Sequence, residues 1–305
     1  MSDVELHFDP DDLAPRHDVP VGGRSGFTLI DDRQVHYLEW GHRERAPVLC
    51  LHGGGQTAYM YEELGRALAP RYHVLAPDLP SHGDSDPADG DAPLRELLAA
   101  SVPPLLNQFG FGRAVVVGAS LGGITAITLA SREPGLVTGI VLIDVGHRLE
   151  ETGVQRILEF MQAHESFTSL EEAATEIAGY LPHRKEVRPE NLTRNLRQRP
   201  DGRWVWKHGL GRRRRRLADE SGGASPGWRT MLSGLDQDAA SLSCPVLVLR
   251  GGASDVLSDE GAEEVAALIP DARLATIERA GHLAAGDNPH STTALITGFL
   301  TEIGW

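Results

Sequence analysis

The sequence has only two cysteines among its 305 residues, Cys50 and Cys244, so a framework of disulfide bonds is excluded. Each borders an apolar run, and we expect both to be buried free thiols. Basic residues are scarce too, since 29 Lys and Arg stand against 43 Asp and Glu, a formal net charge of -14. Such an excess of acid disfavours binding to nucleic acid or to an anionic membrane.

Long apolar runs are also missing. The longest, such as residues 114–117 and 246–249, are far too short to cross a bilayer. The opening residues MSDVE show neither the basic segment nor the apolar segment of a secretory signal. These absences predict a cytoplasmic protein. The 41% of hydrophobic residues and 24% of charged residues are ordinary for a globular chain and exclude a disordered one.

Eight short apolar runs predict strands. The first two alternate between apolar and polar residues, which is typical of an antiparallel edge hairpin, whereas the later runs are continuous Val, Leu and Ile, which is typical of parallel strands buried on both faces. The runs are residues 27–30, 35–39, 47–51, 73–76, 114–117, 139–143, 245–249 and 273–277. Stretches with helical spacing fall between them, at residues 59–69, 93–109, 121–132, 259–268 and 291–303. This alternation predicts an α/β fold with a doubly wound, mostly parallel, eight-stranded sheet.

Two regions break the alternation. Residues 1–25 are acidic and Pro-rich without periodicity, and we expect an N-terminal extension there. Residues 147–240 form a far longer connection than strands normally need, and they carry their own helical patterns at 154–164 and 170–180. We therefore expect an inserted helical cap at 147–240 on a core made of residues 26–146 and 241–305.

The segment Gly118-Ala119-Ser120-Leu121-Gly122 has the pattern G-x-S-x-G between a predicted strand and a predicted helix. A turn that sharp leaves no room for Cβ atoms two positions either side of the serine, which explains the two glycines. The turn lifts the Ser120 hydroxyl above the sheet, and the N-terminus of the following helix favours developing negative charge. Ser120 is the candidate nucleophile.

A second glycine-rich loop, His52-Gly53-Gly54-Gly55, directly follows the strand at 47–51. Glycines at this point let backbone N–H groups approach a substrate oxygen. Together with the N–H of Leu121, they are candidates for an oxyanion hole.

A serine nucleophile needs a base, and the base needs an orienting carboxylate. His282 follows the strand at 273–277 and Asp255 follows the strand at 245–249, at the edge where doubly wound sheets place their sites. The order Ser120, Asp255, His282 is that of a Ser…Asp…His triad. Asp144, at the end of the strand at 139–143, is a rival for the acid, but we favour Asp255.

With these motifs in this order, the chain resembles the α/β-hydrolase superfamily over about residues 26–146 and 240–303. The segment DLPSHGDS at residues 78–85 adds to the likeness, although Ser81 stands where the family often has glycine. The resemblance implies Ser120 as nucleophile, His282 as base and Asp255 as orienting acid, with Gly54 and Leu121 donating the oxyanion N–H groups.

The resemblance also bears on the reaction. Relatives that open epoxides or remove halides carry Asp at the nucleophile position, whereas Ser120 favours attack on a carbonyl carbon and an acyl-enzyme intermediate. We expect hydrolysis of a carboxylic ester or thioester of a small to medium apolar substrate. Relatives with the same triad cleave C–C bonds, catalyse eliminations or cyclisations without a cofactor, or act as ligand receptors, and these alternatives stay open.

No cofactor and no metal are expected, because the sequence shows no ligands at metal spacing and no dinucleotide-binding glycine pattern. The expected partner is a small-molecule substrate, with no nucleic acid or membrane, and the cap offers a surface through which a homodimer could form. Three sets of residues are weaker candidates for the pocket. They are Tyr59, Met60 and Tyr61 after the oxyanion loop; the cap aromatics Phe160, Phe167, Tyr180, Trp204, Trp206 and Trp228; and the arginine run at 212–216.

Overall fold

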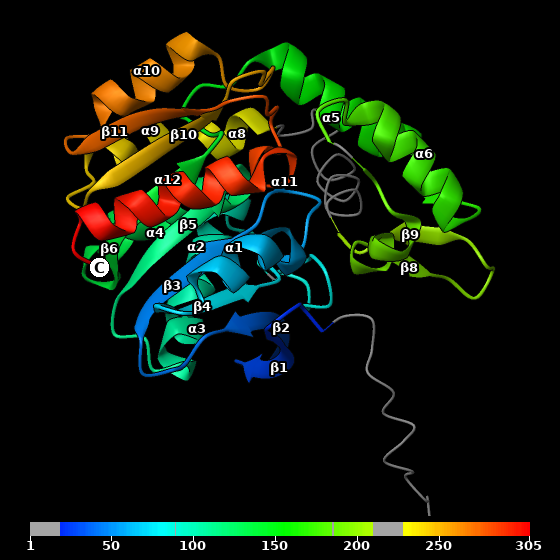
Figure 1. The fold of residues 1–305 in the computed structure, drawn as a ribbon, viewed down its shortest axis with the longest axis horizontal. Coiled ribbons are helices and arrows are strands. Elements are labelled where there is room, and N and C mark those ends of the chain that lie inside the picture. The colour runs from blue at the N-terminus through cyan, green and yellow to red at the C-terminus, as the bar shows by residue number, and fades with distance from the viewer. Residues whose placement is uncertain (1–18, 89, 185, 210–227) are drawn as a thin grey trace, which may run out of the picture.

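The computed structural model describes residues 19–88, 90–184, 186–209 and 228–305 (Figure 1). An eight-stranded sheet runs through it in the order β1-β2-β4-β3-β5-β6-β10-β11. β1 pairs antiparallel with β2, and β2 with β4, while all other neighbours are parallel. The strands are β1 (Arg24–Ile30), β2 (Arg33–Trp40), β3 (Ala46–Leu51), β4 (Tyr72–Pro77), β5 (Ala114–Ala119), β6 (Val137–Ile143), β10 (Val246–Gly251) and β11 (Ala272–Ile277). Every predicted strand takes part, which confirms the predicted mostly parallel α/β sheet.

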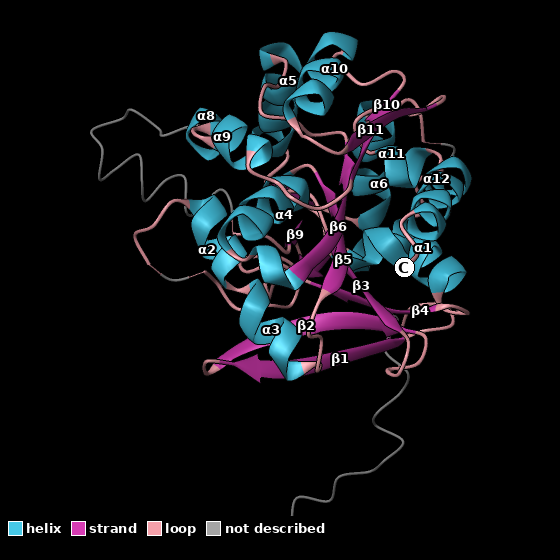
Figure 2. Cartoon of the chain, turned by 90° about the vertical axis from the view of Figure 1, so that its left-hand side faces the viewer, coloured by secondary structure: helices cyan, strands magenta, loops and turns pink. Residues whose placement is uncertain are grey.

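Helices cover both faces of this sheet, as Figure 2 shows from the side. One face carries α2 (Leu94–Ala100), α3 (Val102–Gln108), α4 (Leu121–Arg132), α9 (Leu235–Ala240) and α10 (Asp259–Leu268). The other carries α1 (Glu62–Leu68), α11 (Ala284–Asp287) and α12 (Pro289–Glu302). Val116 of β5 packs into the first apolar layer, and its neighbours Val115 and Val117 pack into the second. Burial on both faces explains why β5 is continuously apolar in sequence.

The single helix expected at residues 93–109 is broken into α2 and α3 at Ser101. Pro103 and Pro104 are the second and third residues of α3. Proline lacks the N–H that a continuous helix would need and its ring clashes with the preceding turn, so these two residues are tolerated only in the first turn of a new helix. In contrast, α10 has the predicted bounds, because the hydroxyl of Ser258 accepts a hydrogen bond from the N–H of Gly261 and caps its N-terminus.

The long connection after β6 forms a cap beside the sheet, seen in green at the right of Figure 1. Its helices α5 (Glu151–Ala163) and α6 (Leu170–Tyr180) match the predicted pair closely. A small sheet, absent from the prediction, joins β7 (Ser166–Phe167), β9 (Trp204–Trp206) and β8 (Leu196–Gln198). The cap has its own apolar cluster, which includes Phe167 and Ile177 and against which Phe160, Trp204 and Trp206 pack. Most cap aromatics thus belong to its core.

The chain returns to the core through α8 (Trp228–Leu232) and α9. The carboxylate of Asp238 in α9 binds Arg95 of α2 and Arg132 of α4, both at 2.7 Å, so the core resumes before residue 241. Short 3-10 helices lie at Ala58–Tyr61, Pro134–Leu136 and Pro189–Arg194. The arginine run at 212–216 and most of the N-terminal extension lie outside the described residues.

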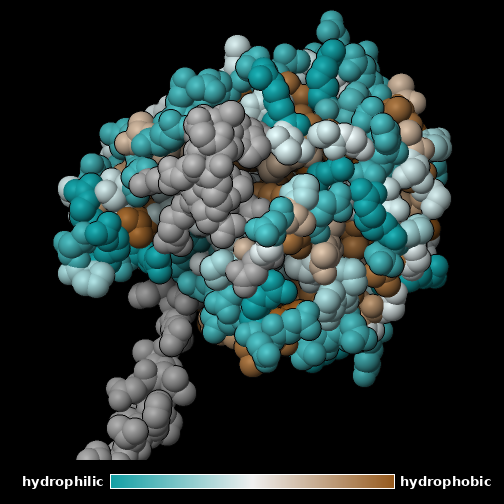
Figure 3. All heavy atoms as spheres, turned by 180° about the vertical axis from the view of Figure 1, so that it is seen from behind, coloured by the Kyte–Doolittle hydropathy of each residue, from teal (hydrophilic) through white to brown (hydrophobic). Residues whose placement is uncertain are grey.

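On the face seen in Figure 3, hydrophobic residues appear only in scattered patches. No helix within the described ranges is long and apolar enough to cross a membrane. Both cysteines are free, with Cys50 buried in β3 and Cys244 partly exposed. Burial raises the pKa of both thiols, to about 11 for Cys244.

Candidate active site

Ser120 sits at the sharp turn between β5 and α4, with φ 47° and ψ -113°. Such a backbone conformation is strained for a residue with a Cβ, and it persists only where the surroundings enforce it. The two flanking glycines supply the space. A Cβ on Gly118 would collide with the carbonyl of Gly122, and a Cβ on Gly122 would collide with the carbonyl of Leu51. The predicted steric reason for the G-x-S-x-G pattern is therefore present in the structure.

This close packing makes Gly122 sensitive to the smallest substitution. We expect Gly122→Ala to lower the free energy of unfolding by about 3 kcal/mol, because the obstructing atoms are backbone and cannot move aside cheaply. Gly298→Ala in α12 is the matched control, since nothing lies within 4 Å of its Cβ position. It should raise stability by about 0.5–1 kcal/mol. Denaturant unfolding of both variants, followed by circular dichroism, measures the difference, and equal effects would contradict the steric reading.

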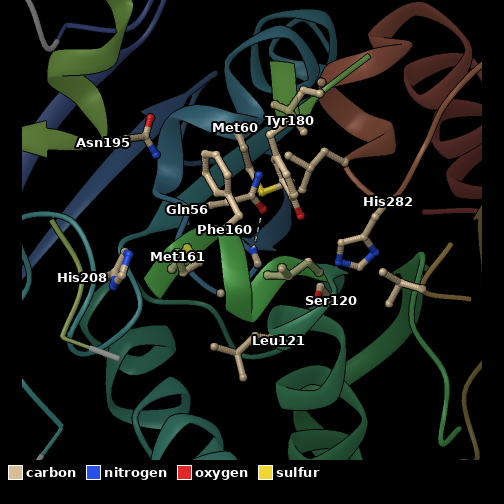
Figure 4. A pocket seen from close by; sticks show the side chains of 18 of the residues that line it. Gln56, Met60, Ser120, Leu121, Phe160, Met161, Tyr180, Asn195, His208 and His282 are labelled. Carbon is tan, nitrogen blue, oxygen red and sulfur yellow. Dashed lines mark hydrogen bonds between the residues drawn. The ribbon is translucent and has the colours of Figure 1, made fainter. Parts of the chain in front are cut away.

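His282 lies beside Ser120 in the same cleft, as Figure 4 shows. Its Nδ1 lies 2.8 Å from Oδ2 of Asp144. A carboxylate only accepts hydrogen bonds, so Nδ1 carries the proton and Nε2 is the nitrogen left for Ser120. Asp144 is fully buried, and its two oxygens also accept hydrogen bonds from the N–H of Gly251, at 2.8 Å, and from the hydroxyl of Ser254. The carboxylate is thus locked in the position that orients the imidazole.

The prediction that Asp255 orients His282 is wrong. The side chain of Asp255 is 40% exposed and turns to the cap, where Arg156 of α5 binds both of its oxygens at 2.7 and 3.1 Å. The reason lies in the register of the sheet. Ala119 of β5 pairs with Ile143 of β6, so Ser120 and Asp144 directly follow paired residues at the ends of two neighbouring strands. Asp255, in contrast, lies four residues past the end of β10. Asp144, the rival, is the one that the fold brings to His282.

The predicted oxyanion groups, Gly54 and Leu121, both line the cleft at Ser120. Leu121 is the first residue of α4, so its N–H has no partner inside the helix. Hydrogen bonds of its own side chains fix the neighbouring loop at residues 52–56. The N–H of Gly53 donates to Oε1 of Gln56 at 3.2 Å, marked by the dashed line in Figure 4. His52 accepts a hydrogen bond from the N–H of Leu79 at 2.9 Å. Gln56 was missed by the sequence analysis, and no pattern in the sequence marks it.

The segment at residues 78–85 shapes the next loop. Ser81 adopts φ 68°, a backbone conformation that favours glycine, which fits the glycine that the family resemblance leads one to expect there. Burial on its own raises the pKa of Asp78, but the hydrogen bond from His36 at 2.7 Å, the charges of His36 and His52 and the hydrogen bond from the N–H of Ala58 together outweigh it and lower the pKa overall. His36, Asp78 and Asp84 lie close enough to hold a cation. Their ligand atoms are already engaged, by Ser25 at 2.9 Å and by Lys207 at 2.8 Å among others, so the group fits a structural network better than a metal site.

The described residues border a cavity of about 2410 Å³ between the carboxyl edge of the sheet and the cap. Near Ser120 its walls include the apolar side chains of Met60, Leu121, Phe160 and Met161, with the amide of Gln56 among them (Figure 4). Of the predicted cap aromatics, Phe160, Tyr180, Trp206 and Trp228 line this cavity. Phe160 and Trp206 therefore serve both the cap core and the cavity wall.

Comparison with known protein families agrees with the fold. The model of the alpha/beta hydrolase family matches residues 48–295, which contain Ser120, Asp144 and His282. The chain belongs to this family. This alpha/beta hydrolase is 31% identical over 276 residues to the esterase Rv0045c of Mycobacterium tuberculosis, covering 87% of the chain and 86% of the esterase. It is 29% identical over 265 residues to the sn-1-specific diacylglycerol lipase ABHD11 of Mus musculus, covering 83% and 80%.

Solved structures agree on the fold of the hydrolase. The crystal structure of E-2-(acetamidomethylene)succinate hydrolase superimposes with a TM-score of 0.77 at 22% identity, covering 92% of this chain and 99% of that one. At that identity the likeness speaks for the fold alone. The relatives named as an esterase and a lipase are the ones that bear on the reaction.

Proposed function

We propose that the protein is a serine hydrolase that cleaves a carboxylic ester or thioester of a small to medium apolar substrate through an acyl-enzyme. The observation that carries the proposal is the His282 imidazole, fixed through Nδ1 to the buried carboxylate of Asp144 and set beside Ser120. The similarity to an esterase and a lipase supports the same reaction.

The proposed mechanism uses these side chains in turn. Ser120 Oγ attacks the carbonyl carbon, and Nε2 of His282 takes its proton while Asp144 stabilises the imidazolium. The negative charge that develops on the carbonyl oxygen faces the N–H groups of Leu121 and Gly54. His282 then returns the proton to the leaving group. A water molecule, activated by the same histidine, releases the acid from Ser120.

The cavity wall supports an apolar acyl group. Met60, Phe160 and Met161 present hydrophobic side chains next to Ser120, and such walls bind ligands by removing apolar surface from water. Acyl transfer of this kind uses the three side chains, the oxyanion N–H groups and water. The homodimer through the cap stays a prediction.

Treatment with a fluorophosphonate tests the proposal. An activated serine attacks phosphorus and displaces fluoride, so the intact mass of the wild-type protein should rise by one phosphonyl group. Ser120→Ala should show no adduct under the same conditions. Hydrolysis of p-nitrophenyl esters with acyl chains of increasing length should then define the size of the acyl group. A folded wild-type protein that forms no adduct and hydrolyses none of these esters would contradict the proposal.

A further inference from the structure

Tyr180 is the last residue of α6 and reaches from the cap into the cleft. In Figure 4 its hydroxyl points toward the side of the cavity where Ser120 and His282 lie. Within the described residues this hydroxyl makes no hydrogen bond. Burial raises the pKa of Tyr180, so the group stays protonated at neutral pH and remains a hydrogen-bond donor.

Two side chains of α5 contact the ring that carries this hydroxyl. Phe160 of α5 stacks on it with a centroid distance of 4.2 Å and an interplanar angle of 18°. The guanidinium of Arg156 lies 4.9 Å from the ring centroid, which is the geometry of a cation–π contact. Arg156 in turn is fixed by the two oxygens of Asp255. Phe160 and Arg156 therefore hold the ring, with Asp255 fixing Arg156, and the hydroxyl is left available to a molecule bound in the cleft.

The position of the hydroxyl decides which substrate atom it meets. The oxyanion N–H groups of Gly54 and Leu121 belong to the loop after β3 and to the start of α4, whereas the leaving group departs on the side of His282, which must protonate it. Tyr180 enters the cleft from the cap, on the side of His282 (Figure 4). Its hydroxyl is placed for the leaving-group oxygen rather than for the carbonyl oxygen.

We propose that Tyr180 is a catalytic residue that donates a hydrogen bond to the leaving-group oxygen of the bound ester, and that Asp255 and Arg156 position it. The inference rests on the proposed function. Tyr180 keeps its own proton throughout, since the proton that the leaving group acquires comes from Ser120 through His282. The hydrogen bond stabilises the negative charge that gathers on that oxygen as the C–O bond breaks.

The leaving group supplies the test. Two esters of the same acid are compared, one with an alkyl alcohol and one with p-nitrophenol. An alkoxide is a strong base that depends on a donor, whereas p-nitrophenolate spreads its charge over the ring. We expect Tyr180→Phe to lower kcat/KM about 10- to 100-fold for the alkyl ester and less than about 3-fold for the p-nitrophenyl ester. Equal losses for both esters, or no loss, would overturn the proposal.

Two controls distinguish the loss of this hydrogen bond from a folding defect and from failure of the proposed function. Tyr72→Phe also removes one phenolic oxygen, which donates to the backbone carbonyl of Trp305 far from the cleft, and it should leave the ratio between the two esters unchanged. Tyr180→Phe should still form the single fluorophosphonate adduct, which would show that Ser120 and His282 remain functional in the folded variant. If the wild type itself formed no adduct, the proposed function would fail rather than the role of Tyr180.

The positioning role of Asp255 has its own signature. Asp255→Asn removes the charge that anchors Arg156, and it should lower kcat/KM a few-fold for the alkyl ester alone. Asp255→Glu keeps the charge and should restore part of the loss. A loss that is the same for both esters would show that Asp255 only stabilises the cap.

Discussion

Asp144→Asn is expected to lower kcat for a p-nitrophenyl ester by about 10³- to 10⁴-fold, the loss typical of a triad that loses its orienting carboxylate. An amide presents an N–H₂ group as readily as an oxygen, so it no longer fixes the proton on Nδ1 of His282. The wrong tautomer then turns an N–H toward Ser120 and blocks proton transfer. Steady-state kinetics on the purified variant, with circular dichroism to establish folding, measures the effect.

Asp255→Asn is the matched variant, since it makes the same chemical change on the other candidate acid. Its carboxylate binds Arg156 rather than His282, so kcat for the p-nitrophenyl ester should stay within about 3-fold of wild type. A large loss for Asp255→Asn with little loss for Asp144→Asn would refute the assignment of Asp144. Equal large losses would mean that His282 exchanges partners during the reaction.

The largest effect is expected for Ser120→Ala, which should lower kcat by about 10⁴- to 10⁶-fold. Attack on the carbonyl carbon has no substitute once the hydroxyl is gone. The remaining rate would come from the oxyanion groups and from substrate binding. Alanine keeps the Cβ at the strained turn, so the thermal midpoint should change by only a few degrees.

Kinetics and a thermal melt of the same Ser120→Ala preparation check this expectation. Activity above about 1% of wild type in a folded variant would remove Ser120 from the nucleophile role. It would favour acid–base chemistry by His282 instead, and analysis of the products for oxygen from labelled water would then separate hydrolysis from elimination.

The sheet and the turn at Ser120 were predictable because local rules determine both. Strands buried on both faces read as continuous apolar runs, and every such run entered the sheet. Gly118 and Gly122 are required by sterics that act within a few residues, so they mark the turn in any context. His282 followed from its place after the last strand.

The acid of the site was mispredicted because its position depends on the register between strands. Asp144 and Asp255 both follow strands that end at the same edge, and chain order alone favoured the later one. Only the pairing of Ala119 with Ile143 shows that Asp144 stands level with Ser120. Gln56 and the small cap sheet were missed for a related reason, since they depend on contacts between segments that are distant in the sequence or that carry no repeating pattern.

Several ion pairs join the cap to the sheet and its loops. Arg194 binds Glu62 at 2.7 Å, Lys207 binds Asp84 at 2.8 Å, and Arg156 binds Asp255, while the apolar cluster of the cap is separate from the two layers that hold the sheet. Changes inside the cap cluster reshape the wall that selects the substrate and leave the packing around Ser120 and Asp144 intact. In the course of evolution, the range of substrates in such a protein can drift while the reaction itself is inherited unchanged.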